Sequence, residues 1–111
     1  MRDQVCIILN ERESTKHAAV ASLLDLLKKS SITASRIEIT EKIIELACLR
    51  CPEILVLDYL LGDYSTGLDI VYAVNKLPAE KRPVIYFLTD EPSVQVAVEA
   101  MQLGVMNYFQ L

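Results

Sequence analysis

Residues that break regular structure or carry specialised chemistry are few: the 111 residues include 3 glycines, 4 prolines, 3 cysteines and 1 histidine. So little glycine and proline beside 52% apolar residues excludes a disordered or low-complexity chain. The odd number of cysteines argues against an extracellular disulfide framework. No apolar run approaches the roughly 18 residues of a membrane span, and no long signal-peptide core follows Met1. We therefore expect one cytoplasmic domain, residues 1–111, with a single core and no membrane contact.

Basic side chains are scarce in the second half of the chain. Residues 56–111 hold three basic and seven acidic side chains, whereas residues 1–55 hold eight of each, and the net charge is −4. This balance lacks the basic footprint of a nucleic-acid-binding surface, so we expect no direct contact with nucleic acid. An acidic half suits a divalent cation or a basic partner surface, although acidic surfaces also serve solubility alone.

The motifs of several enzyme classes are missing. The first apolar segment is followed not by a glycine-rich phosphate loop but by residues 10–13, Asn-Glu-Arg-Glu, which would repel a diphosphate. There is no Gly-x-Ser-x-Gly sequence and no histidine placed as a hydrolase base. Cys48 and Cys51 have the spacing of a zinc or redox pair, but no second pair follows and His17 is remote. Packing at a helix end is therefore the default interpretation of this pair.

Strand-like and helix-like segments alternate along the chain with short connections. The patterns predict strands at Val5 to Leu9, Arg36 to Ile39, Leu55 to Leu57, Val84 to Leu88 and Met106 to Phe109. They predict helices from Ser14 or Thr15 to Lys29, from a Thr40 cap to Leu49, from Gly67 to Leu77, and from a Ser93 cap to Gly104. Crossovers this short between apolar strands require the α/β class, with a doubly wound five-stranded parallel sheet and helices on both faces.

Polar side chains follow three of these strands at the edge where the carboxyl ends of parallel strands meet. Asp58 directly follows the apolar run Ile54 to Leu57, Asn10 and Glu11 follow the first strand, and Thr89 follows the fourth. Glu11 and Asp58 suit a hard cation such as Mg²⁺, and the Thr89 hydroxyl could donate to an anionic oxygen beside it. Together they suit phosphoryl transfer to a carboxylate, with Asp58 as the nucleophile. The alternative is that these residues are only turn formers and helix caps.

The segments around Asp58 and Thr89 carry a more specific pattern. Its residues are Leu57-Asp58-Tyr59-Leu60-Leu61, then Gly67-Leu68-Asp69, and then Phe87-Leu88-Thr89-Asp90-Glu91-Pro92-Ser93-Val94 running into residues 97–108. These residues resemble the receiver domain of bacterial two-component response regulators, and the resemblance covers nearly the whole chain. It implies a flavodoxin-like sheet order of 2-1-3-4-5.

The resemblance also assigns roles to individual residues. It implies that Asp58 is the phosphoacceptor, Thr89 the switch hydroxyl and Tyr108 the aromatic switch. It implies a Mg²⁺ site formed by Glu11, Asp58, the backbone carbonyl of Leu60 and, more weakly, Asn10. Asn10 stands where the family usually has an aspartate, which removes a charge but keeps an amide oxygen.

Two further departures concern the end of the chain. Leu111 falls at the family's lysine position and cannot pair with a phosphoryl oxygen. The family's fifth helix is absent from this chain, so we expect a domain truncated at its C-terminus with one sheet face partly uncovered. Apolar residues of Val5 to Ile8 and of Val105-Met106 are then expected to be partly exposed. The expected consequence is either a homodimer or a longer chain whose continuation supplies the helix.

The sequence therefore predicts a signalling module and not an enzyme. Its expected partners are a histidine kinase, which phosphorylates Asp58, and an output domain or downstream protein reached around the fourth helix and fifth strand. The alternative is a pseudo-receiver, a phosphorylation-independent interaction module, which accounts more simply for Asn10 and Leu111. A metal-dependent phosphatase is a weaker interpretation, because no second nucleophile or general acid is evident near Asp58.

Overall fold

The computed structural model describes residues 4–9, 14–50, 52–61, 65–89 and 94–110. The strands are β1 (Val5–Ile8), β2 (Ala34–Arg36), β3 (Ile54–Leu57), β4 (Leu60–Leu61), β5 (Ser65–Thr66), β6 (Val84–Thr89) and β7 (Asn107–Gln110). The helices are α1 (Ser14–Lys29), α2 (Ile43–Arg50), α3 (Gly67–Val74) and α4 (Val94–Gln102), with a 3-10 turn at Ala79–Lys81. None of the helices in these ranges is long and apolar enough to cross a membrane.

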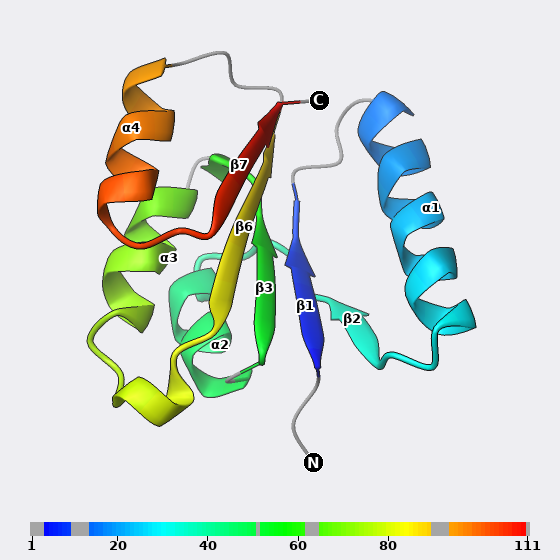
Figure 1. The fold of residues 1–111 in the computed structure, drawn as a ribbon, viewed down its shortest axis with the longest axis horizontal. Helices are drawn as coiled ribbons and strands as arrows, with labels where there is room; N and C mark the ends of the chain where they lie inside the picture. Colours follow the sequence, from blue (N-terminus) through cyan, green and yellow to red (C-terminus); the bar gives the residue numbers. More distant parts are fainter. Residues whose placement is uncertain (1–3, 10–13, 51, 62–64, 90–93, 111) are drawn as a thin grey trace.

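Five parallel strands form the central sheet in the order β2-β1-β3-β6-β7. Leaving out β4 and β5, which pair separately, this is the order 2-1-3-4-5, so the predicted α/β fold is confirmed. The chain moves outward from β1 to β2 and then in the opposite direction for every later strand. Right-handed crossovers therefore place α1 on one face of the sheet and α2, α3 and α4 on the other (Figure 1).

The core is divided unequally between these two faces. Alternate residues of each strand point to opposite faces, so Leu55 and Leu57 face α2, α3 and α4 while Ile54 and Val56 face α1. The larger cluster of buried side chains comprises Cys6, Ile8, Ile37, Ile43, Ala47, Leu55, Leu57, Leu61, Leu68, Ile70, Val71, Val74, Ile85, Phe87, Val96, Ala100 and Val105. The cluster under α1 comprises Val5, Ile7, Leu9 and Val56.

The second strand and the loop after Asp58 differ from the sequence prediction. The second strand is Ala34–Arg36 instead of Arg36 to Ile39. Arg36 lies opposite Ile7 and β1 ends at Ile8, so residues 38 and 39 have no β1 residue to pair with. The loop contains β4 and β5, which pair antiparallel with Leu60 opposite Thr66. Strands of two residues carry no periodic signal in a sequence.

The predicted exposure of β1 was wrong. Val5 to Ile8 and Val105 are all buried, because α1 packs over β1 on one face and the helices of the other face cover the rest; Met106 is 56% exposed, as expected. The open part of the α1 face lies over β6 instead, where Val84 is 40% exposed. An apolar cavity of about 270 Å³ opens there, lined by Val5, Leu23, Leu27, Ile54, Val56, Tyr86 and Leu88.

Candidate functional site

Asp58 is the first residue after β3, the middle strand of the sheet. Its backbone N–H donates to the Ile8 carbonyl at 2.9 Å, which extends the β1–β3 pairing by one residue and fixes the position of Asp58. Its Oδ1 accepts a hydrogen bond from the Tyr59 N–H at 2.8 Å. Asp58 is 0% exposed and is the one polar or charged side chain buried among the described residues. Because burying a carboxylate costs free energy, its retention here indicates a role other than packing.

Gly67, the first residue of α3, lies directly against Asp58. Its N–H donates to the Tyr59 carbonyl at 2.7 Å. A Cβ at Gly67 would overlap the Asp58 backbone carbonyl and would lie 2.6 Å from Cε1 of Phe87. Only glycine therefore allows α3 to begin this close to the site. The sequence pattern marks Gly67 only as a helix start, since nothing local in a sequence reveals a tertiary approach of this kind.

Phe87 connects the surroundings of Asp58 to Tyr108. The β6 register pairs Phe87 with Leu57 of β3 on one side and with Tyr108 of β7 on the other. The rings of Phe87 and Tyr108 stack with their centroids 5.8 Å apart and their planes at 24°. Phe87 is fully buried and Tyr108 is half-buried against the larger core cluster. Only the Phe87 ring thus lies between Gly67 and the ring of Tyr108. The role of Tyr108 as a switch stays a prediction.

The backbone brings three predicted site residues to the carboxyl edge of the sheet. Asp58 follows β3, Leu60 begins β4 two residues later, and Thr89 is the last residue of the neighbouring strand β6, opposite Gln110. Asn10, Glu11 and Leu111 lie outside the described residues. In the part of the chain that the structure describes, no three His, Cys, Asp or Glu side chains gather as a metal site. A carboxylate and a backbone carbonyl two residues apart in the chain nevertheless supply oxygen donors of the kind that Mg²⁺ takes, and a metal site here would need the predicted Glu11.

One member of the cysteine pair can be placed. Cys48 lies on α2, half-buried against the larger core cluster, which fits the packing interpretation. Cys51 lies outside the described residues.

Comparisons with known proteins bear on this arrangement. No family model matches the chain. The regulatory protein LuxO of Vibrio cholerae is 41% identical over 61 residues, which is 53% of this chain and 12% of that protein. The matching segment therefore spans only a small part of the curated relative.

Solved structures resemble the chain over nearly its whole length. The signal receiver domain of a protein described as a LuxO repressor from Vibrio parahaemolyticus superposes with a TM-score of 0.74 at 21% identity, covering 99% of this chain and 78% of that one. A response regulator from Burkholderia pseudomallei, solved with a phosphorylated aspartic acid, a calcium ion and citrate, gives 0.71 at 20% identity, covering 97% and 59%. The chain therefore has the receiver-domain fold, and the resemblance drawn from its sequence is confirmed at the level of fold.

Proposed function

We propose that this chain is a response-regulator receiver module of the cytoplasm that accepts a phosphoryl group on Asp58 from a histidine kinase. Phosphorylation would relay a conformational change to an output domain or downstream protein in two-component signalling. The burial of Asp58 at the carboxyl end of the middle strand carries this proposal. The receiver fold and the phosphorylated aspartate of the Burkholderia pseudomallei regulator support it.

The transfer step needs a phosphohistidine donor and the site residues predicted from the sequence. A carboxylate oxygen of Asp58 attacks the phosphorus of a phosphohistidine, the new O–P bond forms, and the P–N bond breaks with its electron pair passing to the imidazole nitrogen. Thr89 would donate its hydroxyl proton to a phosphoryl oxygen in a hydrogen bond. A Mg²⁺ ion held by Asp58, Glu11, the Leu60 carbonyl and Asn10 would neutralise charge that develops on the phosphoryl oxygens.

The surroundings of Asp58 offer a path for the relay. Gly67 begins α3 against the Asp58 carbonyl and the Phe87 ring, and that ring stacks on Tyr108. A new charged group on Asp58 would alter the contacts around Gly67 at the start of α3, and the Phe87 ring would carry the change to Tyr108 of β7. The proposed output is a shift in population between two conformations of these elements, with no new chemistry.

The residues at two positions favour the pseudo-receiver as a second candidate. Asn10 stands in place of an aspartate and Leu111 in place of a lysine. These replacements suit a module that binds partners without being phosphorylated.

Phosphorylation in solution separates the two candidates. We expect the wild-type chain, incubated with Mg²⁺ and acetyl phosphate, to gain one phosphoryl group by mass spectrometry, and Asp58→Asn to gain none. Glu53→Gln is the matched control, because Glu53 is an exposed carboxylate at the opposite end of the same strand. A folded wild-type chain that stays unmodified, and shows no spectral change with beryllofluoride, would establish the pseudo-receiver.

The metal site is tested by three forms of the chain. Asn10→Asp restores a carboxylate and should tighten Mg²⁺ binding, whereas Glu11→Gln removes one and should weaken it. Calorimetric or NMR titration with Mg²⁺ measures both changes against the wild type. Equal affinity in all three forms would contradict a metal site at this edge.

A further inference from the structure

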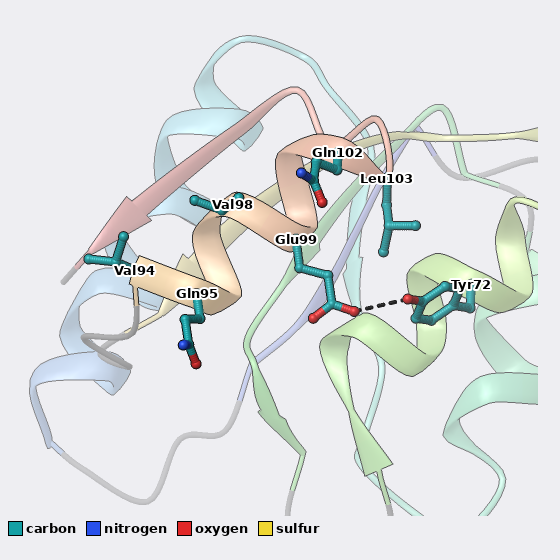
Figure 2. Close-up of a pocket in the computed structure, with 7 residues that line it drawn as sticks. All are labelled: Tyr72, Val94, Gln95, Val98, Glu99, Gln102 and Leu103. Atoms are coloured by element: carbon teal, nitrogen blue, oxygen red, sulfur yellow. Dashed lines mark hydrogen bonds between the residues drawn. The ribbon is translucent and has the colours of Figure 1, made fainter.

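A groove lies between α3 and α4, on the side of these helices that faces away from the sheet. Its volume is about 450 Å³, and Tyr72 lines it from α3 while the other lining residues belong to α4 and the turn after it (Figure 2). These are Val94, Gln95, Val98, Glu99, Gln102 and Leu103. The groove is separate from the apolar cavity under α1, which lies on the opposite face of the sheet.

Two hydrogen bonds across the groove hold its walls in place. The Tyr72 hydroxyl donates to Oε1 of Glu99 at 2.9 Å, which Figure 2 shows bridging the two helices. The Asn75 Nδ2 donates to the Leu103 carbonyl at 3.0 Å, just beyond the C-terminal ends of both helices. The hydrogen bond to Glu99 and its negative charge also raise the pKa of Tyr72 above its usual 10.0. The groove is therefore preformed, which lowers the entropic cost of binding.

Apolar side chains along the groove are strongly exposed. Val94 is 77% exposed, Val98 51% and Tyr72 48%, and Met101 continues the stripe on α4 at 49%. Single exposed apolar residues need no explanation, but a contiguous row beside a groove is typical of an interaction surface. The spacing of Val94, Val98 and Met101 places them along one side of α4, so a partner helix lying along this stripe would meet all three.

The charged side chains of α3 and α4 are all acidic. Asp69 is the charged residue of α3 and Glu99 that of α4, and neither helix contains lysine or arginine. Glu99 lies in the middle of the groove, and a carboxylate that accepts from Tyr72 on one oxygen has capacity for further donors. A cation on the partner would complement this surface, whereas an acidic partner would be repelled.

We propose that the α3–α4 groove receives an amphipathic helix of a partner protein, with apolar side chains against Tyr72, Val94 and Val98 and a lysine or arginine against Glu99. This deepens the proposed function, since the occupant would belong to the downstream protein. Helix-in-groove recognition of this kind combines apolar anchors with a flanking charge. The surface is formed without a phosphoryl group on Asp58, so binding itself does not require phosphorylation.

The probe is a capped synthetic peptide of about 14 residues, long enough for helix formation on a surface, with leucines on one face and lysines on the other. We expect its titration into the isotope-labelled full chain to shift NMR signals of α3 and α4. A peptide with glutamate in place of lysine should bind the wild-type chain about tenfold more weakly, and the lysine peptide should bind Glu99→Gln about tenfold more weakly. Val98→Ser should also weaken binding, while Glu45→Gln, which removes an exposed carboxylate from α2, should not.

Three outcomes would overturn the proposal. They are signal shifts confined to the α1 face, equal affinity for the lysine and glutamate peptides, and an equal loss from Glu99→Gln and Glu45→Gln, which would show non-specific charge attraction. Amide signal dispersion confirms that each variant is folded. The two proposals can fail separately. If the peptide binds but acetyl phosphate adds no phosphoryl group to the chain, the proposed function fails and this inference stands. If Asp58 is phosphorylated but no peptide binds, this inference alone fails.

Discussion

The two faces of the sheet differ in how they are covered. On one face, three helices pack on the strands and bury a continuous cluster that extends from Cys6 of β1 to Val105 before β7. On the other face, α1 covers β1 and part of β3, and Val84, Tyr86 and Leu88 of β6 remain half-buried or exposed beside an apolar cavity. The same strands thus carry a closed face and an open face.

Because of this difference, we expect the closed face to contribute most of the stability of the fold and the open face to be the one available to a binding partner. Side chains of the closed face are fixed by close packing, so removing atoms there leaves voids that the structure cannot refill. Side chains of the open face already border empty space, so their loss changes less. The candidate site draws on the closed face, since Gly67 lies there against Asp58 and Phe87, and Tyr108 stacks on Phe87.

The largest expected effect is the difference between a leucine-to-alanine substitution on the closed face and the same substitution on the open face. Leu55→Ala removes a fully buried side chain from the closed face and should lower the free energy of unfolding by roughly 2 to 5 kcal/mol. Leu88→Ala acts at a half-buried position beside the cavity and should cost about 1 kcal/mol. Urea unfolding followed by circular dichroism measures both. Equal losses would show that the two faces are packed equally well.

Gly67→Ala tests the closed face where it meets the site. The added methyl group would collide with the Asp58 carbonyl and the Phe87 ring, so we expect a loss of about 1 to 3 kcal/mol and reduced phosphorylation by acetyl phosphate. Gly104→Ala is the control: Gly104 has φ 91° and a methyl group there would meet no other part of the fold, so any loss is conformational only. Phosphorylation that falls equally in both variants would contradict a direct effect on Asp58.

Val84→Lys tests the open face. If this face drives self-association, a charge at an exposed β6 position should shift the chain toward monomer in light scattering. Stability should change by no more than about 0.5 kcal/mol, since Val84 is already 40% exposed. A wild-type chain that is monomeric and binds no hydrophobic dye would show that the open face recruits no copy of itself.

The smallest expected effect is the pH dependence of the Tyr72–Glu99 bond. The hydrogen bond to Glu99 and its negative charge raise the pKa of Tyr72 above its usual 10.0. Because the folded state holds this proton more tightly than the unfolded state, the contribution to stability is present below pH 10.0 and is lost as pH rises through the folded-state pKa. The difference in absorbance titration between wild type and Tyr72→Phe should show the raised pKa, and Glu99→Gln should lower it.

Periodicity and end signals were enough to predict the main sheet and its helices. The apolar runs of β3 and β6 predicted buried strands, and Gly104 marked the end of α4, where its φ is positive. The position of Asp58 followed from the same logic, because parallel strands gather their carboxyl ends at one edge. Gly67 against Phe87 could not be predicted, because that contact depends on how α3 approaches the sheet.

The covering of the faces was harder to predict than the strands themselves. The lack of a second helix on the α1 face predicted an exposed β1, yet α1 packs over β1 and the gap falls over β6. Which strand a helix covers depends on its crossing geometry, and side-chain pattern alone does not contain that information. The roles of Asp58, Thr89 and Tyr108 remain predictions that the phosphorylation experiment addresses.

The strand order also limits how copies of this chain could assemble. The two edges of the sheet are β2, with three residues, and β7, with four, so an added strand would find few backbone groups to pair with at either edge. The apolar surface over β6 lies on a face and not at an edge. An assembly of copies through this apolar surface would therefore use the part of the sheet face beside α1, instead of extending one sheet from molecule to molecule.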